Sequence, residues 1–324
     1  MSTILQPSSE RDVCARTDVG VPATRPTFVL TFDFEDWHQL VYRRIGRTDW
    51  RVGSEEFRSH VSTLLDLLDE LGLTATFFVV GVTAERHPEV LLDVVARGHE
   101  IGCHGYEHVR IFQQTPAEFG CDVVACLDAV ERICGIRPEG YRAPWFSITH
   151  DSLWAPEILR SLGFRYDSSL VDSPRIPHRI TPIPAGPFRL QQGPDGLVEF
   201  PTAVLRRGKV VLPLGGGAYW RALPGAVLWQ GLEALGRRAP FPVLYFHPYE
   251  FSPETLRVVL PGGASAREHV RESWRQLSKN ARRGLIRERL VEAAARFRLV
   301  PVRDVLEEQH GFDPALLREA RAGS

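Results

Sequence analysis

The sequence predicts an α/β protein with a parallel sheet, and three observations support this prediction. Short apolar runs rich in β-branched and aromatic residues alternate with stretches of helical periodicity. Glycines stand where the helical stretches end, and polar residues follow several of the apolar runs. In such folds, functional side chains collect at the carboxyl ends of the strands. The chain of 324 residues exceeds a usual single domain, yet one barrel-type α/β domain can absorb most of it.

The first half of the chain gives the clearest elements. Thr27–Asp33 is expected to form a strand, and Glu55–Leu71 a helix with leucines at helical spacing that ends at Gly72. A helix that begins at Thr115 carries a capping-box pattern, with proline at its first position and glutamate at its third. Further strands are expected over residues 75–80, 100–103, 140–142 and 164–167, and further helices over residues 88–97 and 149–162.

The second half of the chain is less regular. Ser173–Pro194 is rich in proline and glycine and is expected to be a long loop over the site. Strands are expected over residues 198–200 and 243–247, with a flexible Gly215–Gly217 between them. One long helix is expected over Glu268–Arg298, followed by a short strand and helix. The sequence thus predicts one domain over residues 26–310, between a flexible tail of residues 1–25 and a C-terminal tail of residues 311–324.

Composition narrows the functional class. The net charge of -1 predicts neither nucleic-acid binding nor attraction to an anionic membrane. Five cysteines, an odd number without a Cys-x2-Cys pair, favour a reduced, cytoplasmic setting. No basic start precedes an apolar segment, and no apolar run reaches the ~18 residues of a membrane span. We therefore expect a cytoplasmic location that extends to the inner face of the membrane, and the composition carries no signal for an oligomeric state.

Two separated segments look like the halves of one metal site. His104 and His108 are four residues apart, so on a helical turn both imidazoles could reach one divalent ion. Asp33, Glu35 and Asp36 stand about seventy residues upstream, where the first strand is expected to end. Each segment alone is more often an ordinary pair of histidines or a solvated acidic loop. Together, two imidazoles and one carboxylate would leave a position open for water, as in catalytic sites.

Three further segments end in chemically capable side chains. Arg142 follows a predicted strand and is either a surface residue or the partner of a buried carboxylate. Trp145 and Phe146, just beyond it, could wall a groove for sugar rings. His247 ends a late strand and is either structural or catalytic, and Asp167 is the candidate to orient it through a ring nitrogen.

As a set, these segments resemble the polysaccharide deacetylases with a NodB homology domain, carbohydrate esterase family four. Thr31–Asp36 resembles the first motif of that family, His104–His108 matches the second, and Arg142–Trp145 resembles the third. Asp167 corresponds to the fourth motif and residues 245–247 to the fifth. The resemblance covers residues 28–306 and implies a distorted (β/α) barrel of seven strands. Residues 166–169, 215–219 and 247–251 are similar to the branch found with exopolysaccharide and cell-surface glycan loci.

The resemblance also implies roles for the site residues. Asp33 would be the general base, contacted by Arg142, and His247 the general acid. The backbone N–H of Trp145 would be an oxyanion donor, and His104 and His108 would bind the metal.

The third metal ligand is either Glu35 or Asp36. The choice stays open because Phe34 separates Asp33 from Glu35, where most members of the family have two adjacent aspartates. Strand alternation places Asp33 and Glu35 on one face, which favours Glu35 as the ligand. Asp36 could bind instead if the backbone turns early.

The implied activity is hydrolysis of an N-acetyl group from an amino sugar of a glycan or glycan precursor, which would be the partner of the chain. One divalent metal ion is expected, with zinc preferred and cobalt, nickel or iron accepted by the same ligands. The alternatives are a cyclic-amide hydrolase related to allantoinases on the same fold, and a non-catalytic glycan-binding relative. A compact pocket would favour the cyclic-amide hydrolase, whereas an aromatic groove is predicted from Trp37, Trp145, Phe146, Trp220 and Tyr249.

Overall fold

The computed structural model describes residues 25–308 except 48–49, 53, 175, 177–178, 191–195, 209, 259 and 261–263. The two predicted tails, residues 1–25 and 311–324, lie outside the described residues apart from Arg25.

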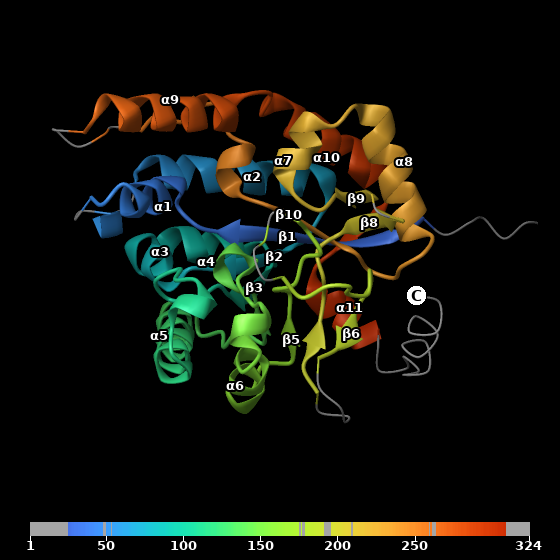
Figure 1. The fold of residues 1–324 in the computed structure, drawn as a ribbon, viewed down its shortest axis with the longest axis horizontal. Helices are drawn as coiled ribbons and strands as arrows, with labels where there is room; N and C mark the ends of the chain where they lie inside the picture. The colour runs from blue at the N-terminus through green and yellow to red at the C-terminus, as the bar shows by residue number, and fades with distance from the viewer. Residues whose placement is uncertain are drawn as a thin grey trace, which may run out of the picture.

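A curled parallel sheet forms the centre of the molecule (Figure 1). Seven strands follow one another in parallel in the order β10-β1-β2-β3-β4-β5-β7, with β11 beside β1 and an antiparallel β6 beside β7. The strands are β1 (Thr27–Phe34), β2 (Thr76–Val79), β3 (Glu100–Cys103), β4 (Gly140–Tyr141), β5 (Tyr166–Asp167), β6 (Phe188–Arg189), β7 (Val198–Glu199), β10 (Val243–Phe246) and β11 (Arg298–Val300). A separate antiparallel hairpin consists of β8 (Val204–Arg207) and β9 (Val210–Pro213).

The two ends of this strand order come together beyond β7. Thr202, just after β7, forms a parallel bridge to Val243 of β10, and Gly216 forms one to Tyr245 of the same strand. The backbone amide of Ala203 donates to the carbonyl of Val243 at 2.8 Å. These contacts join the segment after β7, at one end of the strand order, to β10 at the other end, and the sheet therefore curls toward closure. The predicted distorted (β/α) barrel is confirmed.

Helices cover the sheet on both sides, with α7 to α10 on one side and α5 and α6 on the other (Figure 1). They are α1 (Trp37–Arg44), α2 (Glu56–Leu71), α3 (Gly81–Arg86), α4 (Pro88–Ala96), α5 (Pro116–Cys134), α6 (Ala155–Ser161), α7 (Gly217–Ala222), α8 (Gly225–Gly236), α9 (Ala266–Asn280), α10 (Gly284–Arg296) and α11 (Val302–Glu308). None of the helices in the described part of the chain is both long and apolar enough to span a membrane.

The clearest predicted elements are confirmed. Strand β3 has the predicted bounds, and α2 ends at Gly72, whose φ of 63° is the left-handed conformation that glycine adopts without strain. Thr115 caps α5: its hydroxyl accepts from the backbone of Glu118, whose carboxylate accepts from the backbone of Thr115.

The single long helix predicted over residues 268–298 is wrong. The helix breaks after Asn280, where Arg282 takes a left-handed φ of 57°. Arg283 then points its guanidinium into the body of the molecule and donates to the carbonyl of Tyr249 at 2.7 Å. The predicted helix over residues 149–162 is also shorter, because a 3-10 turn (His150–Ser152) precedes α6.

The predicted flexibility of Gly215–Gly217 is wrong as well. All three glycines are buried. A Cβ on Gly215 would clash with Cγ2 of Thr202, and one on Gly217 would lie 2.5 Å from Oε1 of Glu250. Glycine is required here because the backbone passes too close to its neighbours for any side chain. The expected loop of residues 173–194 likewise contains β6.

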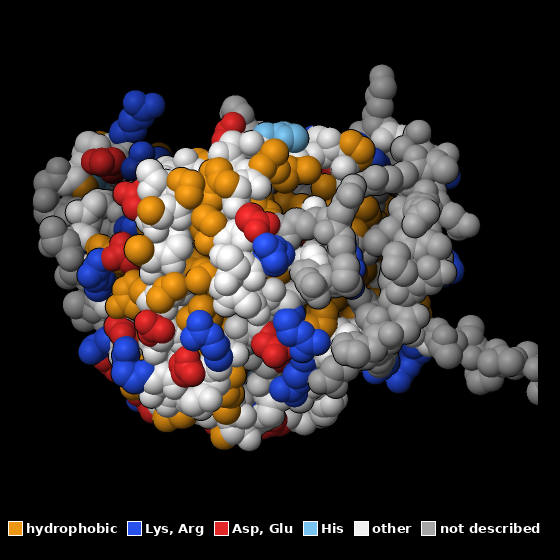
Figure 2. Space-filling view, turned by 90° about the horizontal axis from the view of Figure 1, so that it is seen from below, with side chains coloured by type: hydrophobic (Ala, Val, Ile, Leu, Met, Phe, Trp, Pro, Cys, Tyr) orange, Lys and Arg blue, Asp and Glu red, His pale blue; other side chains and the backbone are white. Residues whose placement is uncertain are grey.

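Figure 2 shows the face turned away from the side on which α9 lies in Figure 1, and acidic and basic side chains stand next to one another on it. Ion pairs of this kind occur around α5 and α6, as between Arg165 and Glu139 at 2.7 Å and between Arg137 and Glu131 at 3.0 Å. Charge on this side is therefore locally balanced.

Candidate active site

The candidate site lies at the carboxyl ends of adjacent strands. Asp33 is the second-last residue of β1 and Glu35 follows the strand directly, as His104 follows β3. Arg142 follows β4, and His247 follows β10, which pairs with β1. All five side chains are buried or nearly so. Parallel pairing brings segments that are far apart in the sequence to one edge of the sheet.

Three of these side chains form a possible metal site. Ligand atoms of Glu35, His104 and His108 all lie within 4.8 Å of one another. Oε2 of Glu35 is 3.0 Å from Nε2 of His108 and 3.9 Å from Nε2 of His104. Burial alone would raise the pKa of Glu35, but His108 and His247 hold it well below its usual range. Glu35 is thus an ionised carboxylate that faces two imidazoles.

The prediction that His104 and His108 lie on a helical turn is wrong. They stand in a loop after β3, in which Gly105 has a φ of 73° and His108 a φ of 56°. The carboxylate of Asp122 on α5 holds this loop, because it accepts hydrogen bonds from the backbone amides of Tyr106 and Glu107 at 2.9 and 3.0 Å. The imidazoles of His104 and His108 are therefore brought together by the left-handed residues of a loop and not by a helix.

His104 is oriented as a metal ligand. Its Nδ1 lies 2.7 Å from the carbonyl of Arg142 and donates to it, so Nε2 faces the site with its lone pair. Burial lowers the pKa of His104 to about 4, which keeps the imidazole neutral. A neutral imidazole with one nitrogen fixed by a backbone carbonyl is the form that binds metals in proteins.

Asp36 is not at the metal site, and this part of the prediction is wrong. The backbone turns directly after β1, where the amide of Glu35 donates to the carbonyl of Asp33 at 2.9 Å. Asp36 then caps α1: Oδ1 accepts from the amide of His38 at 2.8 Å and from the hydroxyl of Ser54 at 3.2 Å. Glu35 is the acid that faces the histidines.

Asp33 is held by Arg142, as predicted. Nη1 of Arg142 donates to Oδ1 of Asp33 and to Oγ1 of Thr31, both at 2.8 Å. Arg142 itself is fully buried and is fixed from its other side by Ser168, whose carbonyl and hydroxyl accept at 3.1 and 2.9 Å. The second oxygen of Asp33 lies 3.9 Å from Nε2 of His104 and 3.8 Å from Nε2 of His247. Asp33 therefore presents its second oxygen to the metal side.

His247 faces the same point from β10. Its Nε2 is 3.1 Å from Oε1 of Glu35, and its Nδ1 is 3.2 Å from Oε2 of Glu250. Burial would lower the pKa of His247, but the two glutamates raise it to about 10. Glu250 was missed in the sequence, although His247-Pro248-Tyr249-Glu250 has the pattern of a capping box. That pattern places the glutamate back against the histidine.

The predicted contact of Asp167 with His247 is wrong. The carboxylate of Asp167 accepts from the hydroxyl of Ser169 and pairs with Glu199. Burial raises the pKa of Asp167 to about 6 and that of Glu199 well above its usual range, so the two carboxyl groups hold a proton between them. Ser169 in turn accepts from the amide of Ala143 at 2.8 Å. Asp167 thus supports the loop after β4 and not the histidine.

Comparison with known proteins assigns the family. Residues 20–166 match the polysaccharide deacetylase family, and residues 168–307 match a domain of unknown function, DUF3473. Residues 20–166 of the chain therefore form a domain of the polysaccharide deacetylase family. Asp33, Glu35, His104 and Arg142 lie in the first matched segment and His247 in the second, so residues from both segments form the candidate site.

Individual relatives are distant. The peptidoglycan deacetylase-like protein FGM2 of Gibberella zeae is 34% identical over 38% of this chain and 36% of its own length. The chain spans about two fifths or less of the length of the curated relatives that it matches first. A solved structure from Mycobacterium smegmatis, assigned as a polysaccharide deacetylase, has a TM-score of 0.58 at 24% identity over 90% of this chain and 93% of its own. The PuuE allantoinase has the same TM-score at 16% identity over 95% and 99%. These likenesses show the fold that deacetylases share with the allantoinase.

The aromatic groove predicted for this deacetylase family member is largely wrong. Of the five aromatic residues, only Trp145 is exposed, at 44%. Trp220 lies in the core and donates its indole N–H to the carbonyl of Leu214 at 2.7 Å. Tyr249 is also buried and stacks on His247 with 5.1 Å between ring centroids. Trp145 remains at the rim, with its ring 5.7 Å from that of His108.

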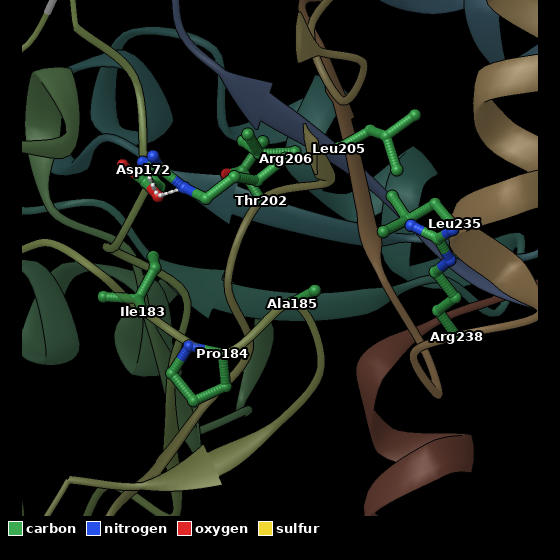
Figure 3. A pocket seen from close by; sticks show the side chains of 10 residues that line it. Asp172, Ile183, Pro184, Ala185, Thr202, Leu205, Arg206, Leu235 and Arg238 are labelled. Atoms are coloured by element: carbon green, nitrogen blue, oxygen red, sulfur yellow. Dashed lines mark hydrogen bonds and ion pairs between the residues drawn. The ribbon is translucent and has the colours of Figure 1, made fainter. Parts of the chain in front are cut away.

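A cavity of about 120 Å³ is shown in Figure 3. It is bordered by residues 183–185 of the expected proline-rich loop, by Thr202, and by Leu235 and Arg238 at the end of α8. Asp172 lies at its edge and accepts hydrogen bonds from Arg206 and Thr181. None of the predicted site residues lines this cavity.

Proposed function

We propose that the chain hydrolyses the N-acetyl group of an amino sugar in a glycan or glycan precursor, with a divalent metal ion as cofactor. One observation carries this proposal: Glu35, His104 and His108 converge with Asp33 and His247 on one buried point. Amide hydrolysis at a metal needs ligands, a base for the water and an acid for the leaving amine, and separate residues are present for each.

The donor set fits a divalent ion. Glu35, His104 and His108 would hold it, and three protein ligands leave a position for water or substrate. Two imidazoles and one carboxylate suit zinc, which we propose, and also cobalt, nickel or iron. When bound, such an ion lowers the pKa of a coordinated water from ~15.7 toward neutrality and polarises the acetyl carbonyl.

Asp33 would act as the general base. Arg142 occupies Oδ1, which leaves Oδ2 facing the metal side to accept the proton of the water. Because the guanidinium is itself fixed by Thr31 and Ser168, it keeps Asp33 in one orientation. General base catalysis by a positioned carboxylate contributes about 10²–10⁴-fold.

His247 would act as the general acid. Glu250 engages Nδ1, so a proton on Nε2 points toward the site, where it can be donated to the departing amine. The backbone N–H of Trp145 would add an oxyanion donor, and one such donor is worth about 2.7–4 kcal/mol. The exposed Trp145 ring would contact the sugar.

The proposed substrate class follows from the relatives. Those that the chain matches first include peptidoglycan deacetylases, and another relative is a chitooligosaccharide deacetylase. We propose an N-acetylated glycan of exopolysaccharide or cell-surface synthesis, modified at the cytoplasmic side as a polymer, a lipid-linked intermediate or a nucleotide sugar.

Acetate release with defined metal content tests this function. The full chain is stripped with a chelator and reloaded with zinc, cobalt, nickel or iron. Each form is then assayed on a panel of N-acetylated sugars and on cyclic imides. We expect metal-dependent acetate release from an N-acetyl sugar, and Asp33→Asn should abolish it while metal content is retained. Hydrolysis of only the cyclic imides would overturn the proposal, as would glycan binding without turnover at any metal.

A further inference from the structure

Helix α9 has its polar and apolar faces reversed relative to a normal surface helix. Val270, Trp274 and Leu277 follow one another on one side and are exposed at 71%, 68% and 69%. Spacings of four and three residues place them in one row along the helix. On a surface helix of a globular protein, such a row normally faces the core.

The inward face of α9 is polar. Glu272 is 2% exposed and accepts from Arg44 of α1 at 2.8 Å. Gln276 accepts from the amide of Val258 at 2.9 Å, and Asn280 accepts from the amide of Leu256 at 2.9 Å. Hydrogen bonds therefore attach α9 to the molecule, and its apolar row is left for something else.

The exposed charge beside the row is positive. Arg267 and Arg271 are one helical turn from Val270 and Trp274 and are exposed. Of the two acids in α9, Glu268 accepts from the backbone and hydroxyl of Ser265 in the capping box. Glu272 is buried, and its single negative charge is shared among Arg44, Arg271 and Arg275, so a net positive charge remains. The overall net charge of -1 conceals this local excess, which contrasts with the balanced ion pairs around α5 and α6. An exposed tryptophan and leucine beside arginines match an anionic lipid surface.

The C-terminal end of α9 lies near the candidate active site. Nζ of Lys279 lies 3.1 Å from the hydroxyl of Tyr249, whose ring stacks on His247. Helices α9 and α1 lie together at the end of the molecule toward which β1 runs, and that end carries the site (Figure 1). A surface that binds the row on α9 would therefore lie close to the catalytic residues.

We propose that α9 is a membrane-surface helix. Val270, Trp274 and Leu277 enter the interface of an anionic bilayer, and Arg267 and Arg271 contact its phosphate groups. The chain then meets its substrate at the membrane. This consequence rests on the proposed function and indicates a glycan attached to lipid, whereas membrane binding itself does not depend on activity.

Co-sedimentation with vesicles tests the proposal on the full chain. We expect binding to vesicles of phosphatidylcholine with one third phosphatidylglycerol, and weak binding to phosphatidylcholine alone. Trp274→Ser with Leu277→Ser should weaken partitioning about tenfold or more, because these side chains lose apolar area in the lipid. Arg267→Gln with Arg271→Gln should weaken it on the anionic vesicles only. Leu153→Ser and Val210→Ser remove exposed apolar side chains elsewhere, at 58% and 66% exposure, and should leave binding unchanged.

Two outcomes would overturn the proposal. One is equal vesicle binding by the α9 variants and the parent chain. The other is no vesicle binding together with self-association that the same α9 substitutions abolish, which would make the row an interface between copies of the chain. Turnover of a soluble N-acetyl sugar separates this proposal from the proposed function, because the α9 substitutions should not change it. Thermal unfolding of each variant confirms that it is folded.

Discussion

Arg142 and Asp33 form a buried ion pair, with 2.8 Å between Nη1 and Oδ1, although 109 positions separate them in the chain. The Arg142 side chain has no exposed area and that of Asp33 has 5%. The pair ties β4 to β1 at the level of the candidate metal site. Each charge depends on the other, because both side chains are buried.

Replacing Arg142 should therefore cost both stability and activity. Arg142→Gln leaves the Asp33 carboxylate buried without a counter-charge, and we expect a loss of about 3–5 kcal/mol in the free energy of unfolding. Arg142→Lys keeps the charge but loses the forked hydrogen bonds to Asp33 and Ser168, so the loss should be smaller. Urea denaturation and kcat measure the two effects. Arg165→Gln, which breaks the exposed pair with Glu139, is the control and should cost about 0–1 kcal/mol.

Substitutions of Glu35 and Asp36, the two acids after β1, should differ in their effect on metal binding. Glu35→Gln should lose the bound metal and the activity, because the carboxylate faces His104 and His108. Asp36→Ala should keep the metal and instead lose about 0.5–2 kcal/mol of stability, because it removes the cap of α1. Elemental analysis and thermal unfolding of both variants provide the measurement. Metal loss in Asp36→Ala with metal retained in Glu35→Gln would contradict the assignment.

Glu250, and not Asp167, should control His247. Glu250→Gln should lower the pKa of His247, because the carboxylate favours the protonated ring, and should reduce kcat about 10–100-fold. Asp167→Asn should leave the nitrogen resonances of His247 unchanged, because Asp167 contacts Ser169 and Glu199. NMR of ¹⁵N-labelled histidine reports the tautomer and the pKa directly. A shift of His247 in Asp167→Asn alone would return the orienting role to Asp167.

Acid should destabilise the protein through His60. This residue is 1% exposed on α2, and among the described residues neither ring nitrogen has a hydrogen-bond partner. Burial lowers its pKa from 6.5 to about 4, so the unfolded chain binds the proton more readily than the native state. The contribution of His60 to the free energy of unfolding is fully present above pH 6.5 and falls as the pH drops toward 4. At pH 5 the loss from this group should be about 2 kcal/mol.

His60→Leu should remove this contribution, so the midpoint of unfolding should fall less between pH 7 and pH 5 than in the parent chain. His150→Leu, at an exposed position, serves as the matched control and should keep the parent slope. Parallel slopes for all three proteins would show that His60 is not the acid-sensitive group.

Local signals predicted the sheet and most of the site. The bounds of β3, the glycine stop of α2 and the capping box of α5 each depend on residues within one element, and the structure confirms them. Asp33, Glu35, His104, Arg142 and His247 converge because the carboxyl ends of parallel strands share one edge, which the alternation of elements already indicates.

The errors arose where contacts between distant segments decide the structure. The break at Arg282 depends on the hydrogen bond of Arg283 to the carbonyl of Tyr249, which no helical pattern reveals. Trp220 is buried because α7 packs on β10, with its ring 4.9 Å from that of Phe246. Asp167 ends a strand as predicted, but whether it faces His247 or Glu199 depends on the curl of the sheet.

The position of β1 between β10 and β2 bears on how the chain is synthesised and truncated. The hydroxyl of Thr31 in β1 donates to the carbonyl of Leu244 in β10, 213 positions later. The edge of β1 that pairs with β10 therefore stays unpaired until most of the polypeptide has been synthesised. A bare strand flank invites pairing with other chains. A fragment cut at residue 166, where the recognisable family match stops, would lack both that flank's cover and His247. Such a fragment should aggregate, and expression of the segment by itself would yield inclusion bodies rather than a minimal catalyst.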